Sequence, residues 1–407
     1  MARDRTPNTR ASIRFASALT FETDARMAAL ELGARIKRAL EGDRVDLALV
    51  FATSHYAEEA HALLDRVRDA LSPAVLVGCS GEGVIGPERE VEGEQAVAVV
   101  AGHLPDVELR SFNLVPAEIL QAAESPLELE KVIHTPKDTR AFILLGDPFS
   151  AQVDGLLRAF NIVHPGVPVI GGMASGARTP GEMALFCGDH TFRQGAVGVG
   201  MAGSIDVNVI VSQGCRPVGP LFAVTAAEAN VIAELEGKPP LEQLQAVVAE
   251  LSEDDRALLR NGLFVGRAID SSKEMLGRGD FLVRGVVGVD RGTGSMAIGD
   301  FVDQGEIVQF HLRDAVTAAE DLEMLLSPQS FFGRPSGALL FSCNGRGTRL
   351  YDHPNGDISA VNAFFAGMPV AGFFCAGEIG PIGSRNFLHG HTAVLALIRP
   401  GSLRDRD

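Results

Sequence analysis

The sequence predicts an α/β protein made of repeated strand-helix-strand units, which form mixed sheets flanked by helices in two tandem domains. Short apolar runs alternate with segments whose apolar residues recur at helical spacing, as expected of an α/β chain. A Cys-x-Gly-Glu motif occurs at 79–82 and again at 375–378, each time directly after an apolar run. A stretch rich in Gly and Pro at 214–219 separates two regions of different pattern.

The first copy of the unit follows a polar tail. Helical spacing and buried-strand runs alternate up to the first Cys-x-Gly-Glu turn, and two further strands come after it. The expected elements are a helix at 24–40, a strand at 45–51, a helix at 55–71, and strands at 74–78, 96–100 and 107–112.

Two later segments repeat this order. The middle copy is degenerate, because its glycine turn at 171–176 has neither the Cys nor the Glu of the motif. Its other elements are a strand at 141–145, a helix at 153–160, and strands at 167–170 and 196–201. The last copy has a strand at 338–342, a helix at 359–365, and strands at 370–374 and 392–398.

The region between 213 and 336 has another pattern. Thr225 and Glu228 have the spacing of a capping box, which predicts a helix at 231–235. Two prolines, 239 and 240, end this helix before a second one at 241–251. We expect strands at 264–269, 282–289 and 307–312, and a helix at 315–326 whose N-cap is Asp314.

Composition and charge exclude several classes of function. The chain has 407 residues with 36 Lys or Arg against 52 Asp or Glu, so nucleic acid is a poor partner. Its five cysteines have no Cys-x-x-Cys spacing, which argues against a disulfide framework and a zinc ribbon. The N-terminus lacks an apolar signal and no apolar run is long enough to span a membrane, so we expect a cytoplasmic protein.

Two glycine patterns do not indicate a nucleotide cofactor. Residues 198–203 match the spacing of a dinucleotide fingerprint, and residues 292–297 are similarly rich in glycine. Each pattern leads into a strand, so a pyrophosphate would meet no helix N-terminus. We therefore expect no cofactor.

Three motifs in the C-terminal region resemble the FIST family of sensory proteins. They are Phe-His-Leu-Arg-Asp at 310–314, Phe-Ser-Cys-Asn-Gly-Arg-Gly at 341–347 and Gly-Phe-Phe-Cys-Ala-Gly-Glu-Ile-Gly at 372–380. The resemblance covers nearly the whole chain. It implies a signal-transduction protein that senses a small molecule such as an amino acid and passes its signal to a separate output protein.

The same resemblance implies a division of the chain. We expect a polar tail at 1–20, a FIST N-terminal domain at 21–212, a FIST C-terminal domain at 213–400 and a tail at 401–407.

The expected ligand site lies at the Gly-rich turns. We expect Glu82 and Glu378 to occupy equivalent positions in two copies of the unit, where a carboxylate suits the ammonium group of a ligand. Arg346, held between two glycines, suits a carboxylate. The full set of expected ligand contacts is Glu378, Arg346, Asn344, Cys375, Glu82 and His389. The structural alternatives are that each glutamate closes its own turn and that Arg346 forms a surface ion pair.

Two other functions stay open at this point. Cys343 or Cys375 as a nucleophile, with His389 as the base, would make a cysteine-dependent hydrolase or an acyl-transfer enzyme. A protein-interaction scaffold without a small ligand is the second alternative. His389 and His391 would share one face of a strand, but no second spaced pair completes a zinc site, so we expect no metal.

Overall fold

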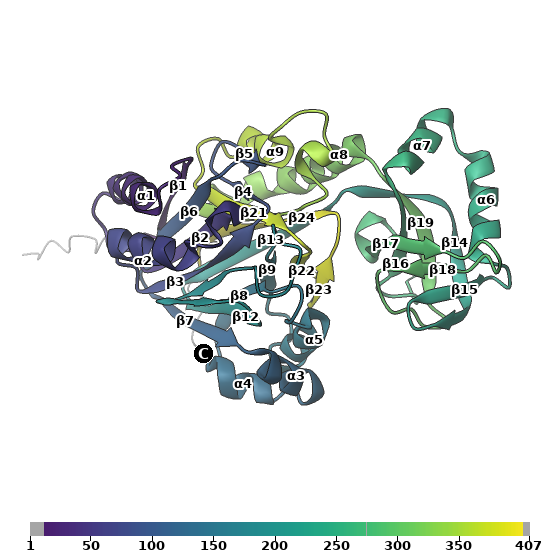
Figure 1. Cartoon of the computed structure of the whole chain (residues 1–407), viewed down its shortest axis with the longest axis horizontal. Helices are drawn as coiled ribbons and strands as arrows, with labels where there is room; N and C mark the ends of the chain where they lie inside the picture. The colour runs from purple at the N-terminus through teal and green to yellow at the C-terminus, as the bar shows by residue number, and fades with distance from the viewer. Residues whose placement is uncertain (1–11, 274, 402–407) are drawn as a thin grey trace, which may run out of the picture.

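The computed structural model describes residues 12–273 and 275–401, which form a three-sheet body with a β-barrel beside it (Figure 1). The body is built from three units that follow one another in the chain. The first unit contains β1 (Arg14–Thr20), α1 (Ala25–Ala39), β2 (Leu47–Thr53), α2 (Ala60–Leu71), β3 (Val75–Gly81), β4 (Gly83–Ile85), β5 (Glu90–Glu92) and β6 (Val97–His103).

The second and third units repeat this order. The second contains β7 (Val107–Leu114), α3 (Pro116–Glu124), α4 (Glu128–Ile133), β8 (Thr139–Gly146), α5 (Val153–Val163), β9 (Val169–Met173), β10 (Leu185–Cys187), β11 (His190–Phe192) and β12 (Ala196–Gly203). The third contains β13 (Ile205–Gln213), α8 (Ala315–Leu326), β20 (Gly337–Cys343), α9 (Gly356–Phe364), β21 (Val370–Cys375), β22 (Glu378–Ile382), β23 (Arg385–His389) and β24 (Thr392–Pro400).

The three sheets share one topology. Their strand orders are β1-β6-β2-β3-β10-β11, β7-β12-β8-β9-β22-β23 and β13-β24-β20-β21-β4-β5. In each, the third and fourth strands are parallel and the other neighbours are antiparallel. The last two strands of each sheet are a hairpin that comes from another unit. The units therefore interlock in a cycle, and the body has threefold pseudo-symmetry.

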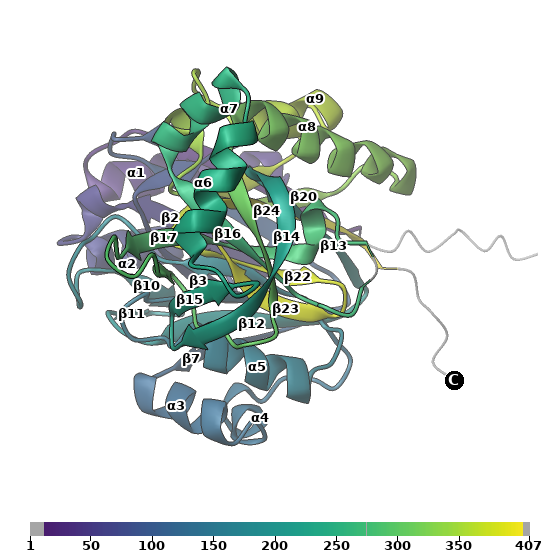
Figure 2. The same cartoon turned by 90° about the vertical axis from the view of Figure 1, so that its right-hand side faces the viewer.

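One apolar core lies between the sheets, and helices cover their outer faces. The rings of Phe51, Phe341 and Phe373 meet in this core, and Phe51 stacks on Phe373 with ring centroids 5.2 Å apart. Helices α1 and α2 cover the first sheet, α3 to α5 the second, and α8 and α9 the third (Figure 2). Because both faces of the inner strands are buried, their sequences are continuously apolar and do not alternate.

A glycine marks the same position in each parallel pair. A Cβ on Gly78, Gly171 or Gly372 would lie 2.0, 2.0 or 1.6 Å from a carbonyl oxygen of the neighbouring strand. No side chain fits there. These three glycines therefore align the units independently of the Cys-x-Gly-Glu motif.

The barrel is an insertion into the third unit. It consists of β14 (Cys215–Glu228), β15 (Val231–Leu235), β16 (Leu263–Ala268), β17 (Phe281–Val289), β18 (Met296–Ile298) and β19 (Ile307–Arg313), with α6 (Pro240–Glu250) and α7 (Glu253–Leu258) on its outside. β14 leaves the body directly after β13, and β19 ends directly before α8, whose N-cap is Asp314 as predicted. In the second unit, Val115 alone separates β7 from α3 at the corresponding place.

The predicted α/β class, with repeated units in mixed sheets flanked by helices, is confirmed. The helix predicted at 231–235 is wrong, since these residues form β15. Thr225 accepts a hydrogen bond from Gly237 N at 2.9 Å and so belongs to a hairpin instead of a capping box. Residues 14–20, expected in a polar tail, form the buried strand β1, whereas 1–11 and 402–407 lie outside the described residues.

Candidate functional site

A cavity of about 430 Å³ lies where the carboxyl ends of strands from the first and third units meet. We call it the Glu82 cleft. Its walls come from the end of β2, the β3–β4 turn, the end of β5, the segment after β20, and β21. Its lining includes the side chains of His55, Glu82, Glu92, Asn344, Thr348, Arg349 and Phe374. Two of the predicted ligand contacts, Glu82 and Asn344, therefore line one cleft.

A bidentate ion pair crosses the cleft from the first unit to the third. Arg349 donates from Nη1 to Glu82 Oε2 at 3.1 Å and from Nη2 to Glu82 Oε1. Arg349 Nη1 also donates to Asn344 O at 2.9 Å. The side chains of Arg349 and Glu82 are 54% and 40% exposed, so water reaches the pair and weakens it.

The backbone under the cleft is tied together by short contacts between units. Ser175 of the second unit accepts from Glu82 N at 2.8 Å and donates to Phe374 O, so it joins the turns of all three units. Glu92 accepts from Thr348 N at 2.9 Å and from Thr348 Oγ1 at 3.1 Å. These contacts hold the ion pair on a rigid base.

Arg346 lies behind the cleft and is fully buried. It donates from Nε to Asp357 Oδ2 at 2.9 Å, from Nη2 to Asp357 Oδ1 at 2.6 Å and from Nη2 to the Tyr351 hydroxyl at 2.7 Å. Burial disfavours its charge, but Asp357 and Tyr351 outweigh this effect and raise the pKa of Arg346. The alternative of a surface ion pair is therefore wrong, because Arg346 is buried and its bonds to Asp357 connect its loop to α9.

Glu378 is also buried, and it is not the counterpart of Glu82. Ile85 pairs with Gly372 and Ile379 pairs with Gly171, so these two isoleucines are equivalent. Glu378 directly precedes Ile379 and thus corresponds to Val84, whereas Glu82 corresponds to Ala376. The expected equivalence is wrong because the Cys-x-Gly-Glu motif is two residues out of register with the sheets.

The Glu378 carboxyl is bonded within its own unit. Its Oε2 accepts from Thr392 Oγ1 at 2.8 Å and from Thr392 N at 3.2 Å. Burial raises the pKa of Glu378 to about 8, although the bonds from Thr392 oppose this. The group is therefore largely protonated at neutral pH and does not supply a negative charge to a ligand.

The two histidines do not share a strand face. His389 ends β23, and His391 follows it in the turn before β24 with a φ of 61°. The His389 ring is bonded through Nε2 to Gly380 O at 2.9 Å. Burial lowers the pKa of each ring to about 4. In the described part of the chain, no group of three or more His, Cys, Asp or Glu side chains is arranged to hold a metal ion.

Cys343 and Cys375 are neighbours across the parallel pair β20–β21. Both are buried, and burial raises the pKa of each thiol above its ordinary value. Among the described residues, neither sulfur is hydrogen-bonded to a histidine ring. Since the thiolate is the nucleophilic form, these surroundings disfavour nucleophilic chemistry at either cysteine.

Family profiles match two consecutive stretches of this chain. The FIST N domain matches residues 46–238 and the FIST C domain matches residues 240–381. The chain belongs to the FIST family. The two tandem FIST domains predicted from the sequence are confirmed, and FIST domains are associated with small-ligand sensing. The exact boundary expected between 212 and 213 stays a prediction.

Relatives of similar length occur in mycobacteria. An uncharacterized protein of Mycobacterium tuberculosis (strain CDC 1551 / Oshkosh) is 38% identical over 376 residues, which cover 92% of this FIST chain and 96% of the relative. An uncharacterized protein of Mycobacterium bovis has the same identity and coverage. A solved structure of a cyanuric acid hydrolase aligns over 96% of this chain and 100% of its own, at 9% identity and a TM-score of 0.31.

Sequence reasoning missed the main basic residue of the cleft. Arg349 lies three residues after Arg346 in the same loop. The Gly-Arg-Gly pattern predicted Arg346 as the ligand contact, but Arg349 is the arginine that lines the cleft. Glu92 and Thr348 were also missed. No local signal identifies them, because their pairing depends on the β4–β5 hairpin of the first unit reaching the third sheet.

Proposed function

We propose that this protein is a sensor that binds a free amino acid in the Glu82 cleft. The observation that carries the proposal is the half-exposed ion pair between Glu82 and Arg349, which lines a cavity of about 430 Å³. Cavities of roughly 300–1,000 Å³ are usual for small ligands.

An amino acid is the ligand that can replace this ion pair without leaving a charge unpaired. Its ammonium group would take Glu82 and its carboxylate would take Arg349 in bidentate geometry. The pair itself contributes little to stability, about 0–1 kcal/mol, because both side chains are exposed to water. Separating Glu82 from Arg349 to admit a zwitterion therefore costs little free energy. A simple amine would leave Arg349 without a counterion, and a simple carboxylate would leave Glu82 without one.

The rest of the cleft suits the same ligand. Asn344 Oδ1 is a buried acceptor without a hydrogen-bond partner among the described residues, so it can receive an ammonium N–H. Phe374 offers an apolar wall for a ligand side chain. Of the predicted contacts, Glu82 and Asn344 line the cleft, and Arg349 takes the carboxylate-binding role that was expected of Arg346.

Thermal-shift and calorimetric titration with the common L-amino acids test the proposal. A ligand at 100 times its Kd is expected to stabilise the protein by about 2.7 kcal/mol. The amide and the N-acetyl derivative of the binding amino acid should each fail, since each lacks one charge. If no amino acid raises the melting temperature, or if both derivatives bind as well as the parent, the proposal is wrong.

We further propose a cytoplasmic location and a separate output protein. The cysteines of the described chain, Cys79, Cys187, Cys215, Cys343 and Cys375, are all free, which supports a reducing compartment. No helix within 12–273 and 275–401 is long and apolar enough to cross a membrane. Cell fractionation tests the location, and crosslinking with and without the amino acid tests whether a partner responds to it.

A further inference from the structure

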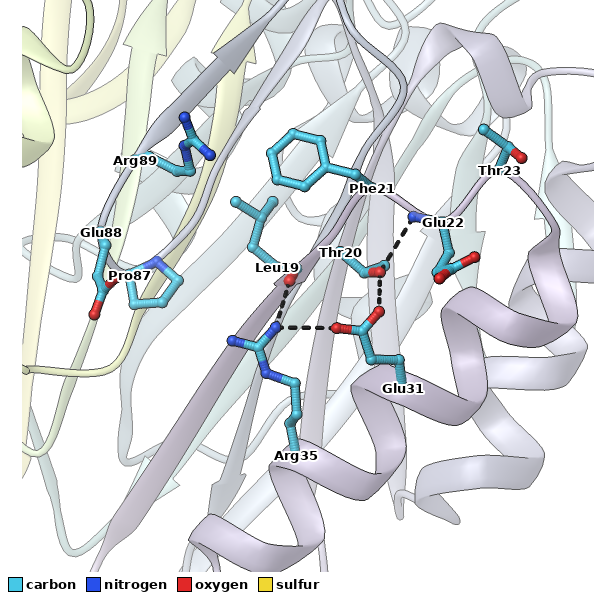
Figure 3. A pocket seen from close by; sticks show the side chains of 10 residues that line it. All are labelled: Leu19, Thr20, Phe21, Glu22, Thr23, Glu31, Arg35, Pro87, Glu88 and Arg89. Atoms are coloured by element: carbon cyan, nitrogen blue, oxygen red, sulfur yellow. Dashed lines mark hydrogen bonds and ion pairs between the residues drawn. The ribbon is translucent and has the colours of Figure 1, made fainter.

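A second cavity, of about 530 Å³, lies beside the first unit, away from the Glu82 cleft. It is formed by the segment between β1 and α1, by Glu31 and Arg35 of α1, and by the tip of the β4–β5 hairpin (Figure 3). Leu19, Phe21 and Pro87 give it apolar walls, and Arg35 and Arg89 approach it from opposite sides. We call it the Phe21 pocket.

Arg35 is held in place with part of its guanidinium free. Its Nη1 donates to Leu19 O at 2.8 Å and to Glu31 Oε1 at 3.3 Å. Glu31 is itself fixed by the hydroxyl of Thr20. Figure 3 shows the other terminal nitrogen pointing into the space beside Leu19 and Pro87. That nitrogen has no hydrogen-bond partner in the described part of the chain, so it can donate to a ligand.

Arg89 supplies a second cation on an aromatic base. Its guanidinium carbon lies 5.4 Å from the centroid of the Phe21 ring, and its side chain forms no ion pair with any described residue. The turn that carries it is fixed at both ends. Gly86 N donates to Arg89 O at 2.9 Å, and Asn362 donates to Pro87 O at 2.9 Å. The cation and the ring are therefore presented by a rigid turn.

The pseudo-symmetry relates the position of the pocket, after β1 of the first unit, to the position after β13 of the third unit. Gly86 packs on Leu19 as Gly380 packs on Val211, so the end of β1 corresponds to the end of β13. At that place in the third unit the chain continues into the barrel, and Asp321 of α8 accepts from Gln213 N at 2.9 Å. In the first unit the chain turns directly into α1, where Glu31 holds Arg35 instead. The Phe21 pocket therefore lies where the chain turns directly from β1 into α1, at the position from which the third unit continues into the barrel.

We propose that the Phe21 pocket binds a small monocarboxylate with a flat apolar body. The carboxylate would bind the free side of the Arg35 guanidinium, and Arg89 would add a second positive charge beside the Phe21 ring. The flat body would pack on Phe21, Leu19 and Pro87. Glu22 and Glu88 also line the pocket, and among the described residues neither carboxylate forms an ion pair with Arg35 or Arg89. Their negative charge disfavours phosphates and other multiply charged anions.

Isothermal titration of the full chain with benzoate tests this inference, with benzamide as the uncharged isostere and acetate as the carboxylate without a ring. Benzoate is expected to bind at least tenfold more tightly than either. Arg35→Gln and Arg89→Gln should each weaken benzoate at least tenfold, whereas Arg110→Gln, in an exposed ion pair on β7, should not. The inference is overturned if benzoate does not bind, if benzamide binds equally well, or if both Arg variants bind as the parent does.

The two sites can be tested apart. Arg349→Gln should leave benzoate binding intact, and Arg35→Gln should leave amino acid binding intact. Loss of benzoate binding in Arg349→Gln would place the benzoate in the Glu82 cleft and would overturn the second site. Failure of every amino acid to bind would contradict the proposed function and would leave the benzoate result standing by itself.

Discussion

Arg346 and Arg349 lie one helical turn apart in the same loop, yet Arg346 is 1% exposed and pairs with Asp357, whereas Arg349 is 54% exposed and pairs with Glu82. One guanidinium holds the loop to α9 from inside, and the other lines the Glu82 cleft. The loop therefore carries one structural arginine, Arg346, and one proposed ligand-binding arginine, Arg349, and this contrast can be measured.

Arg346→Gln is expected to lower the free energy of unfolding by about 3–5 kcal/mol, because it leaves the Asp357 carboxylate buried without its counterion. Arg349→Gln is the matched control and should cost less than about 1 kcal/mol. Urea denaturation of both variants measures the difference. Equal losses would contradict the assignment of the two arginines.

Glu82→Gln should weaken amino acid binding while leaving the fold intact. The substitution keeps the size of the side chain but removes the charge that would receive the ammonium group. We expect at least a tenfold loss of affinity by calorimetry and a change in stability of less than about 1 kcal/mol, since the Arg349 pair is exposed. An unchanged affinity would remove Glu82 from the site.

Glu378 predicts a pH dependence of stability with a definite sign. Its pKa is about 8 in the folded protein against an ordinary value of 4.5, so the folded state retains a proton that the unfolded chain releases. The stabilisation is full below pH 4.5 and is lost as the pH rises through 8, on the order of 5 kcal/mol in all.

Glu378→Gln isolates this effect, because glutamine resembles the protonated acid and does not titrate. Burial also raises the pKa of Glu90 to about 8, with the same sign, but Glu90 is present in both proteins and cancels in the difference. Denaturation at pH 5, 6, 7 and 8 should show the wild type losing stability relative to Glu378→Gln. A constant difference between the two would mean that Glu378 is ionised in the folded state.

The buried cysteines should be unreactive. Because burial raises the pKa of Cys343 and of Cys375, alkylation by iodoacetamide at pH 7.5 should be at least tenfold slower than for free cysteine. Peptide mapping of the native protein measures each rate. A rate above that of free cysteine at either position would favour the hydrolase alternative instead of the sensor.

The body should fold without the barrel. Cys215 and Arg313 are partners in adjacent antiparallel strands, so a short linker in place of 215–313 can join β13 to α8. The excised residues form a closed barrel with its own apolar core, and the second unit makes the corresponding connection through Val115 alone. Circular dichroism of the chain that lacks the barrel, and a cooperative thermal transition in the same chain, show whether the body is folded. An unfolded product would show that the barrel is part of the body.

The sequence determined the class of fold and the existence of repeated units. Apolar runs such as β2 and β20 are long enough to be strands and too short to be helices, and the glycine turns that follow them are locally encoded. The prediction failed where local and tertiary preferences compete. Val231–Leu235 is β-branched at two positions, and pairing with β14 outweighed an apparent capping box.

The site could not be derived in the same way. The two Cys-x-Gly-Glu motifs match in sequence, yet strand pairing places Glu378 opposite Gly172 and Val84 opposite Phe373. Hydrogen-bond register is a property of two strands together, and a shift of two residues keeps every side chain on its face, so no single strand reveals it.

The sequence alone therefore determined most of the elements, the repeated unit and the family, because strand length, glycine turns and apolar spacing are local properties. Only the tertiary structure decided which polar side chains meet. The exchange of hairpins between units brings Glu82 to Arg349 and Glu92 to Thr348 across more than two hundred residues of chain. The packing of the units also places Arg346 and Glu378 in the interior. Contacts of that separation depend on how the units close around their common core, which no local pattern encodes.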